Sequence, residues 1–208
     1  MKIIVFGATG TVGIEIVKQG LATGHQVTAF VRDPDKLANV RHERLRVVQG
    51  DVQNIETLES ALLGQEAVLC ALGDGAKGKI RAVGTGNIME GMTNVGINRL
   101  ICQSTLGAGD SYNSLNFLWK YIMFGILLRR ALADHNLQEK LIRDSSLDYT
   151  IVRPSAFSNG DITKNYEVDF DNNRKGLNLK INRADVADFM LNQLTNNKYH
   201  KKTVSISH

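Results

Sequence analysis

Short runs of apolar and β-branched residues alternate along the chain with longer segments that carry polar residues on one side. Most of the short runs are apolar throughout, which is typical of strands whose two faces are both covered by helices. We therefore predict strands at residues 3–6, 26–31, 45–49, 67–72, 99–104, 149–153 and 203–207.

The longer segments have the periodicity of amphipathic helices. Near the C-terminus, Asn182 is expected to cap a helix that has Asp185 at its third position. After the first strand, apolar residues recur on one helical face, at Val12, Ile16, Val17, Gly20 and Leu21. This alternation predicts a doubly wound parallel α/β sheet, the Rossmann type of fold. No Pro/Ser-rich linker interrupts the pattern, so residues 1–208 are expected to form one domain.

Length and composition are those of one globular domain. The chain has 208 residues, 43% hydrophobic and 22% charged, which excludes a disordered or fibrous protein. The net charge is +4, but the basic residues are scattered, so no nucleic-acid partner is expected. Cys70 and Cys102 are too few for a disulfide framework or a zinc site and are expected to be buried free thiols. The five histidines lack ligand spacing, so no metal site is expected.

The most apolar stretch of the chain is residues 115–128. Asn116 and Lys120 interrupt it, and it is shorter than the ~20 residues needed to cross a bilayer. At the N-terminus only residues 3–6 form an apolar run, which is too short for a signal peptide. These features predict a cytoplasmic protein without a membrane partner.

A glycine-rich turn, Gly7-Ala8-Thr9-Gly10-Thr11-Val12-Gly13, lies between the first predicted strand and the first predicted helix. Glycine there allows a sharp turn, a close approach to a pyrophosphate and tight packing of the helix on the sheet. The phosphate then meets the positive end of the helix dipole. This context predicts a dinucleotide site with Gly7, Thr9, Gly10, Thr11 and Val12 at the pyrophosphate, the alternative being a merely structural turn.

The residue at the end of the second strand distinguishes NAD from NADP. Dinucleotide folds that prefer NAD usually carry an acidic residue there, which binds the ribose 2′-hydroxyl. This chain has Arg32, which can pair with a 2′-phosphate and so predicts NADP(H); a solvated surface arginine is the alternative. The next residue, Asp33, precedes Pro34 and is expected to cap a helix.

Further candidate cofactor contacts stand at the ends of other strands. Asp51 and Val52 follow the third strand, where the Asp51 carboxylate could accept from the adenine amine or could cap the next helix. Leu72 and Gly73 end the fourth strand, where a small residue lets a cofactor pass close to the backbone. The loop that follows holds two cations that either attract an anionic ligand or are simply solvated, Lys77 and Lys79.

The substrate side is expected at the carboxyl ends of the later strands. The fifth strand presents Ser104 there, which could donate a hydrogen bond to the nicotinamide or to a substrate carbonyl, or could satisfy only local backbone. Carbonyl-reducing short-chain dehydrogenases also need a Tyr four residues before a Lys, and none of the five tyrosines has that spacing. A flavin or a tetrapyrrole acceptor does not need such a pair, because the protein only has to hold it against the nicotinamide in a dry site and the proton can come from water. Four aromatic residues form either a surface for such a planar ligand or part of the core: Phe117, Trp119, Tyr121 and Phe124.

Taken in order, these motifs resemble the atypical short-chain dehydrogenase/reductases, the group typified by NADPH-dependent flavin reductase, also called biliverdin reductase B. The resemblance extends over nearly the whole chain. It implies an NADPH-dependent reductase of flavins (FMN, FAD or riboflavin, as substrate rather than bound cofactor) and of biliverdin. The residues that carry it are Gly7 to Gly13, Val31-Arg32-Asp33, Gly50-Asp51-Val52, Leu72-Gly73, Ser104, residues 149–154 and Asp185-Val186-Ala187.

The resemblance also implies the residues of the site. It makes Ser104 the active-site serine and puts the nicotinamide near the fifth and sixth strands, beside Pro154 and Ser155, with residues 105–147 and 155–181 on the substrate side. Where the flavin reductase has a pocket histidine this chain has Ala156, which argues against biliverdin more than against flavin. Relatives of the NmrA-like type are redox sensors that bind the dinucleotide without turnover, and under that alternative a protein partner is expected.

Overall fold

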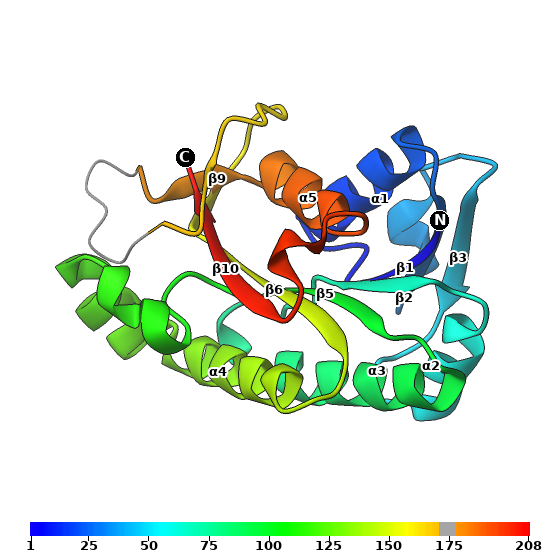
Figure 1. Ribbon diagram of the computed structural model, residues 1–208, viewed down its shortest axis with the longest axis horizontal. Coiled ribbons are helices and arrows are strands. Elements are labelled where there is room, and N and C mark those ends of the chain that lie inside the picture. The colour runs from blue at the N-terminus through cyan, green and yellow to red at the C-terminus, as the bar shows by residue number, and fades with distance from the viewer. Residues whose placement is uncertain (171–177) are drawn as a thin grey trace.

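The computed structural model describes residues 1–170 and 178–208, and it has the doubly wound architecture predicted from the sequence (Figure 1). The main sheet has the order β3-β2-β1-β4-β5-β6-β10-β8. All neighbours are parallel except β8, which pairs antiparallel with β10. Its strands are β1 (Lys2–Phe6), β2 (Gln26–Val31), β3 (Leu45–Gln49), β4 (Ala67–Cys70), β5 (Arg99–Gln103), β6 (Asp148–Pro154), β8 (Glu167–Val168) and β10 (Lys202–Ser207).

Two layers of helices enclose this sheet (Figure 1). One face is covered by α1 (Gly13–Ala22) and α5 (Arg183–Asn192), which contact each other. The other face is covered by α2 (Ile55–Leu62), α3 (Arg81–Val95) and α4 (Arg129–Arg143). Between β5 and α4 the chain forms a short 3₁₀ helix, η3 (Gly109–Ser114), and a π-helical segment, η4 (Leu118–Leu127). The remaining 3₁₀ turns are η1 (Pro34–Leu37), η2 (Gly75–Lys77) and η5 (Asn197–Tyr199).

The two covered faces explain why the strands are apolar throughout. Along β1, Ile3 and Val5 point to the α1–α5 face, while Ile4 and Phe6 point to the α2–α4 face, and all four side chains are fully buried. A solvated face would have required alternating polar residues at two of these positions.

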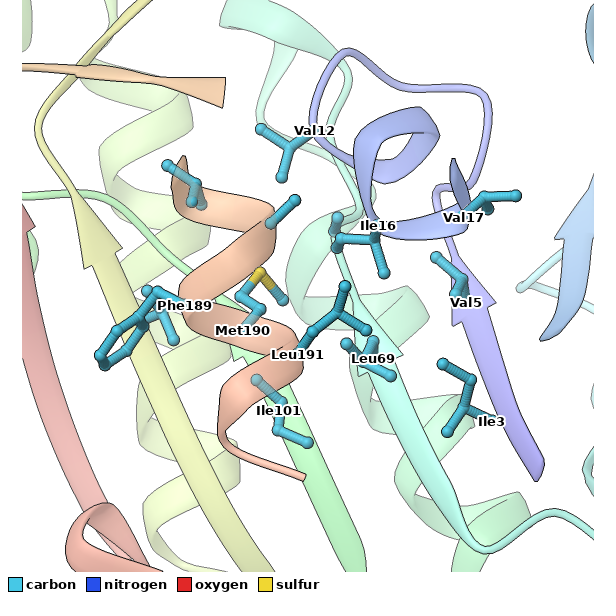
Figure 2. Packing of buried hydrophobic residues seen from close by; sticks show 14 of the residues in the cluster. Ile3, Val5, Val12, Ile16, Val17, Leu69, Ile101, Phe189, Met190 and Leu191 are labelled. Carbon is cyan, nitrogen blue, oxygen red and sulfur yellow. The ribbon is translucent and has the colours of Figure 1, made fainter. Parts of the chain in front are cut away.

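Close packing on the α1–α5 face joins residues that are distant in sequence. Figure 2 shows Met190 and Leu191 of α5 beside Leu69 of β4, with Ile16 of α1 next to them. Full burial of one such side chain stabilises the fold by about 1.5–3 kcal/mol. This packing fixes α1 on the sheet, and with it the glycine-rich turn from which the helix starts.

The structure departs from the sequence-based expectation in the short elements near the C-terminal half. A two-stranded parallel sheet forms from β7 (Ala156–Ser158) and β9 (Lys180–Asn182), and neither it nor β8 was predicted. Asn182 stands at the N-cap position of α5, but its side chain does not cap that helix. The Asn182 side-chain amide instead accepts from Ser158 Oγ of β7 and donates to the carbonyl of Asp161, so it is not available to cap the helix.

Two other predictions can be compared directly with the structure. Cys70 and Cys102 are both buried and free, as predicted, and they face each other across β4 and β5. Within the described residues no helix is long and apolar enough to cross a membrane.

Candidate functional site

The glycine-rich turn is held so tightly that two of its glycines cannot be replaced without a clash. Gly7 has φ +77°, and a Cβ there would lie 2.4 Å from the carbonyl oxygen of Ala71. A Cβ on Gly13 would lie 2.1 Å from the carbonyl oxygen of Gly7, where α1 packs on the turn. Thr9, Gly10 and Thr11 are exposed at its tip. Among the described residues no side chain caps α1 at Val12, so the start of the helix can accept an external anion.

A first cavity of about 700 Å³ opens over this turn at the carboxyl ends of β1, β2 and β4. That volume is within the range of small-molecule and cofactor sites. Ten predicted cofactor residues line it: Gly7, Thr9, Gly10, Thr11, Val12, Arg32, Asp51, Val52, Leu72 and Gly73. The two remaining ones lie elsewhere: Ser155 lines a second cavity, while Pro154 is buried in β6 and lines neither cavity.

Charged side chains along the first cavity show which residues cap the neighbouring helices. Asp33 caps η1 by accepting from the backbone N–H of Asp35, as predicted, while Arg32 is exposed at the cavity edge. The Asp51 carboxylate accepts from the backbone N–H of Gln53, and it is Asn54 that caps α2. Lys77 and Lys79 also line the cavity and are exposed, so with Arg32 the rim carries three exposed cations.

A second cavity of about 440 Å³ adjoins the first. Its wall is mostly apolar and aromatic, with Leu106, Trp119, Phe124, Leu128 and Leu179 among the lining residues. Four residues line both cavities and mark their junction: Gly75, Arg81, Gln103 and Phe157. The arrangement provides room for two ligands that meet at the junction.

The aromatic residues of the apolar stretch divide between two environments. Trp119 and Phe124 face the second cavity and pack with ring centroids 5.7 Å apart. Phe117 and Tyr121 are exposed, with ring centroids 4.8 Å apart. Only the first pair can therefore contact a ligand in that cavity.

Ser104 belongs to a buried polar network that sequence analysis missed. Its hydroxyl donates to Glu139 Oε1 at 2.6 Å, and Glu139 also accepts two hydrogen bonds from Arg153 and one from Arg143. Burial alone would raise the pKa of Glu139, but the bonds and charge of Arg153, with bonds from Ser104 and Arg143, hold this pKa below its usual value. The carboxylate is ionised, and its four acceptor sites are occupied.

Ser104 lines the second cavity, but its hydroxyl already has a partner, and its predicted catalytic role stays a prediction. The serine was expected to donate a hydrogen bond to the nicotinamide or to a substrate carbonyl, but its proton is already directed at Glu139. While that hydrogen bond is made, the Ser104 oxygen offers a ligand only its lone pairs. The reason is physical: an ionised buried carboxylate is a stronger acceptor than a neutral carbonyl.

His135 lies one turn before Glu139 on α4 and lines the second cavity. Burial, followed by the positive charge of Arg81, lowers the pKa of His135 from 6.5 to about 4, although Gln138, Glu139 and Asp134 act in the opposite direction. The imidazole is thus neutral near pH 7 and can donate or accept a hydrogen bond, but it is a poor source of a proton.

Arg81 is held at the junction by acidic groups from two directions. Its guanidinium bonds Asp74 at 2.8 Å and lies 3.6 Å from Asp134. Asp134 also accepts from the backbone N–H groups of Arg81 and Ala82, which ties the start of α3 to α4. These contacts fix the shape of the junction.

Comparison with known proteins shows the family to which the chain belongs. The sequence profile of a family described as NAD(P)H-binding matches residues 7–197, which include the turn and the whole first cavity. The chain belongs to this NAD(P)H-binding family.

Proteins similar in sequence to this chain have diverse names. The chain is 29% identical to photosystem II assembly factor Ycf39 of Synechocystis sp. over 99% of its own length and 62% of that protein's length. It is also 29% identical to UPF0659 protein YMR090W of Saccharomyces cerevisiae, covering 99% of this chain and 92% of that one.

Solved structures with the same fold include a reductase and a protein bound to NADP. ChuY, an anaerobilin reductase from Escherichia coli O157:H7, superposes with a TM-score of 0.84 at 23% identity, covering 100% of this chain and 97% of that one. A short-chain dehydrogenase/reductase from Veillonella parvula in complex with NADP gives a TM-score of 0.82 at 19% identity, covering 100% and 94%. At these identities the likeness establishes the Rossmann-like fold.

Proposed function

We propose that the protein is a reductase that passes hydride from NADPH to a planar, flavin-like acceptor in the second cavity. The observation that carries this proposal is a cavity with an aromatic wall that opens directly onto the dinucleotide cavity. When bound, the nicotinamide supplies the hydride. Trp119 and Phe124 contact the flat face of the acceptor, and the apolar wall keeps water away from the junction.

Proton supply favours a flavin-like acceptor over a ketone. Among the described residues that line the second cavity, none is a ready acid near neutral pH: the His135 imidazole is neutral, and the Ser104 hydroxyl donates its hydrogen bond to Glu139. Arginine side chains do not act as acids at this pH. A ketone needs a proton at its oxygen as hydride arrives, whereas a reduced flavin can take its proton from water.

Arg183 favours an acceptor that carries an anionic group. It lines the second cavity, its guanidinium carbon lies 5.2 Å from the centre of the Phe157 ring, and Nη1 donates to Asn159 at 2.7 Å. Within residues 1–170 and 178–208 it has no salt bridge, unlike Arg81 at the other side of the cavity. A phosphate or carboxylate would complete its coordination, so FMN suits the cavity better than riboflavin.

Arg32→Ala is expected to weaken NADPH binding by about 1.5–3 kcal/mol, or about 10- to 150-fold, because a charged hydrogen-bond partner of the 2′-phosphate is lost. NADH lacks that phosphate, so its affinity should stay the same. Titration of both dinucleotides against both proteins tests this, with the exposed Arg41→Ala as a control for charge alone. An equal loss for NADPH and NADH would contradict the role of Arg32.

The reductase function is tested by mixing the protein with NADPH and FMN and following the loss of NADPH absorbance. We expect FMN to be reduced faster than in the protein-free blank and with a lower KM than riboflavin. Ala156→Phe puts a ring into the second cavity and should abolish FMN reduction while leaving NADPH affinity intact. Ala38→Phe, at an exposed position outside both cavities, is the matched control.

A second candidate is a sensor that binds NADP(H) without turnover. It is supported by the name of the Synechocystis relative, an assembly factor rather than an enzyme. Under this function NADPH binds tightly and no added acceptor is reduced. The rate of NADPH oxidation with FMN then equals the protein-free blank for both the unmodified protein and Ala156→Phe.

A further inference from the structure

A cluster of exposed apolar side chains lies on the outer side of η4. Phe117 and Ile126 are each 72% exposed, which is extreme for side chains of this size. Of the fourteen large hydrophobic side chains exposed in the described part of the chain, six fall within eleven consecutive residues. These six form what we call the apolar cap: Phe117, Leu118, Tyr121, Ile122, Ile126 and Leu127.

The cap is not a poorly buried piece of the core. The inner side of the same segment already packs, since Trp119, Phe124 and Leu128 line the second cavity and join the cluster around Leu106. Segment η4 is therefore apolar on both sides. A helix that is apolar all round is normally covered on all sides, so the outer face calls for an apolar environment.

The charged residues within the cap and next to it in the sequence are positive. Arg129 and Arg130 are exposed directly after it, and Lys120 lies within it, 6.0 Å from the ring of Tyr112. From Ser111 to Ala133 the sequence contains no Asp or Glu. An apolar surface with aromatic residues and a rim of Lys and Arg matches the interface of an anionic bilayer, where apolar tips enter and cations meet headgroups.

Symmetry argues against a second copy of the chain as the occupant. Figure 1 shows the segment in green at the left end of the molecule, beyond the start of α4. In a two-fold dimer the same patch would meet itself, so Lys120, Arg129 and Arg130 would face like charges.

We propose that the apolar cap docks the protein on an anionic lipid bilayer, with Phe117 and Ile126 entering the boundary between headgroups and acyl chains. The expectation of no membrane partner rested on length, which excludes a helix that spans the bilayer but not one that lies in its surface. The docking does not depend on the reductase function, because both vesicle binding and its loss are measured without turnover.

The test is flotation of the full chain with two kinds of vesicle, phosphatidylcholine alone and phosphatidylcholine mixed with phosphatidylglycerol. We expect binding to the anionic vesicles and little to the neutral ones. The double variant Phe117→Asn/Ile126→Asn should bind the anionic vesicles at least about tenfold more weakly, because two large apolar side chains no longer leave water on binding. Arg129→Gln/Arg130→Gln should lose about fivefold for each arginine removed.

Matched controls separate the cap from general surface properties. Leu63→Asn removes an apolar side chain that is 64% exposed at the end of α2, and Arg41→Gln/Arg46→Gln removes two exposed cations elsewhere. Both should bind vesicles like the unmodified protein. Because all the replaced side chains are exposed, the variants are expected to fold, and circular dichroism checks this.

Three results would overturn the proposal. The first is a failure of the unmodified protein to bind anionic vesicles, whether or not the cap binds another protein. Equal binding to neutral and anionic vesicles is the second. The third is a dimer by light scattering that the Phe117→Asn/Ile126→Asn variant dissociates, because the cap would then be buried by a second copy.

Discussion

Replacing Glu139 by glutamine is expected to lower the free energy of unfolding by about 3–5 kcal/mol, the cost typical of breaking a buried ion pair from one side. Glu139 is fully buried, and the side chain of Arg153 is only 4% exposed. Glutamine has one acceptor oxygen where Glu139 offers two, and its amide group would point a donor at an arginine. Arg153 would keep its bond to Asp110, whose side chain is 86% exposed and screened by water.

Urea denaturation of the variant measures this loss. Asp144→Asn is the matched control, because it removes an acid from the exposed Lys140–Asp144 pair on the same helix and should cost less than about 1 kcal/mol. The double replacement Glu139→Leu/Arg153→Met removes both charges and should be more stable than Glu139→Gln alone. If the double variant is instead less stable than the single one, the penalty does not come from an unpaired buried charge.

Lowering the pH from 7 to 4.5 should cost the protein about 2–3 kcal/mol of stability through His135 alone. The pKa of this residue is about 4 in the folded chain and 6.5 in the unfolded chain. Between those values the unfolded chain takes up a proton that the folded chain refuses, so stability falls as the pH falls through this window. Below pH 4 both forms are protonated and the loss stops growing.

The comparison with His135→Gln isolates this contribution. Unfolding free energies of both proteins are measured across the window, and the variant should lose about 2–3 kcal/mol less than the unmodified protein. Acid-sensitive groups such as Asp110 and Asp185, whose pKa values are lowered in the fold, contribute equally to both and cancel. As a control, His42→Gln at an exposed position should lose as much stability between pH 7 and 4.5 as the unmodified protein. If the unmodified protein and His135→Gln instead show the same pH dependence, His135 does not resist protonation in the fold.

The sequence predicts the large elements well because their signals are repeated over many residues. Both faces of β1 are covered, so its run of apolar residues is unambiguous, and the glycines of the turn are dictated by the carbonyls of Gly7 and Ala71. The strands β7, β8 and β9 have two or three residues each, which is too short for any periodic pattern. Asn182 fits a capping pattern, but its side-chain oxygen accepts a hydrogen bond from Ser158, which is 24 residues away in the sequence.

The polar network behind the second cavity is the part of the site that sequence reasoning missed. One signal was available, because Arg153 ends an otherwise apolar strand and a buried arginine needs an acidic partner. Which of the 21 acidic residues supplies it depends on how α4 packs on β6, and no local pattern contains that information. The same holds for Ser104, whose position was predicted but whose proton is directed by Glu139, 35 residues away.

The two cavities are built from almost separate stretches of the chain. The first uses segments within residues 7–12, 30–32, 50–53 and 71–81, while the second draws mainly on residues 103–106, 115–135, 155–157 and 179–183. Substitutions in the second set can therefore accumulate without disturbing the grip on the dinucleotide. In evolution, the ligand of the second cavity can therefore change while the dinucleotide site is retained.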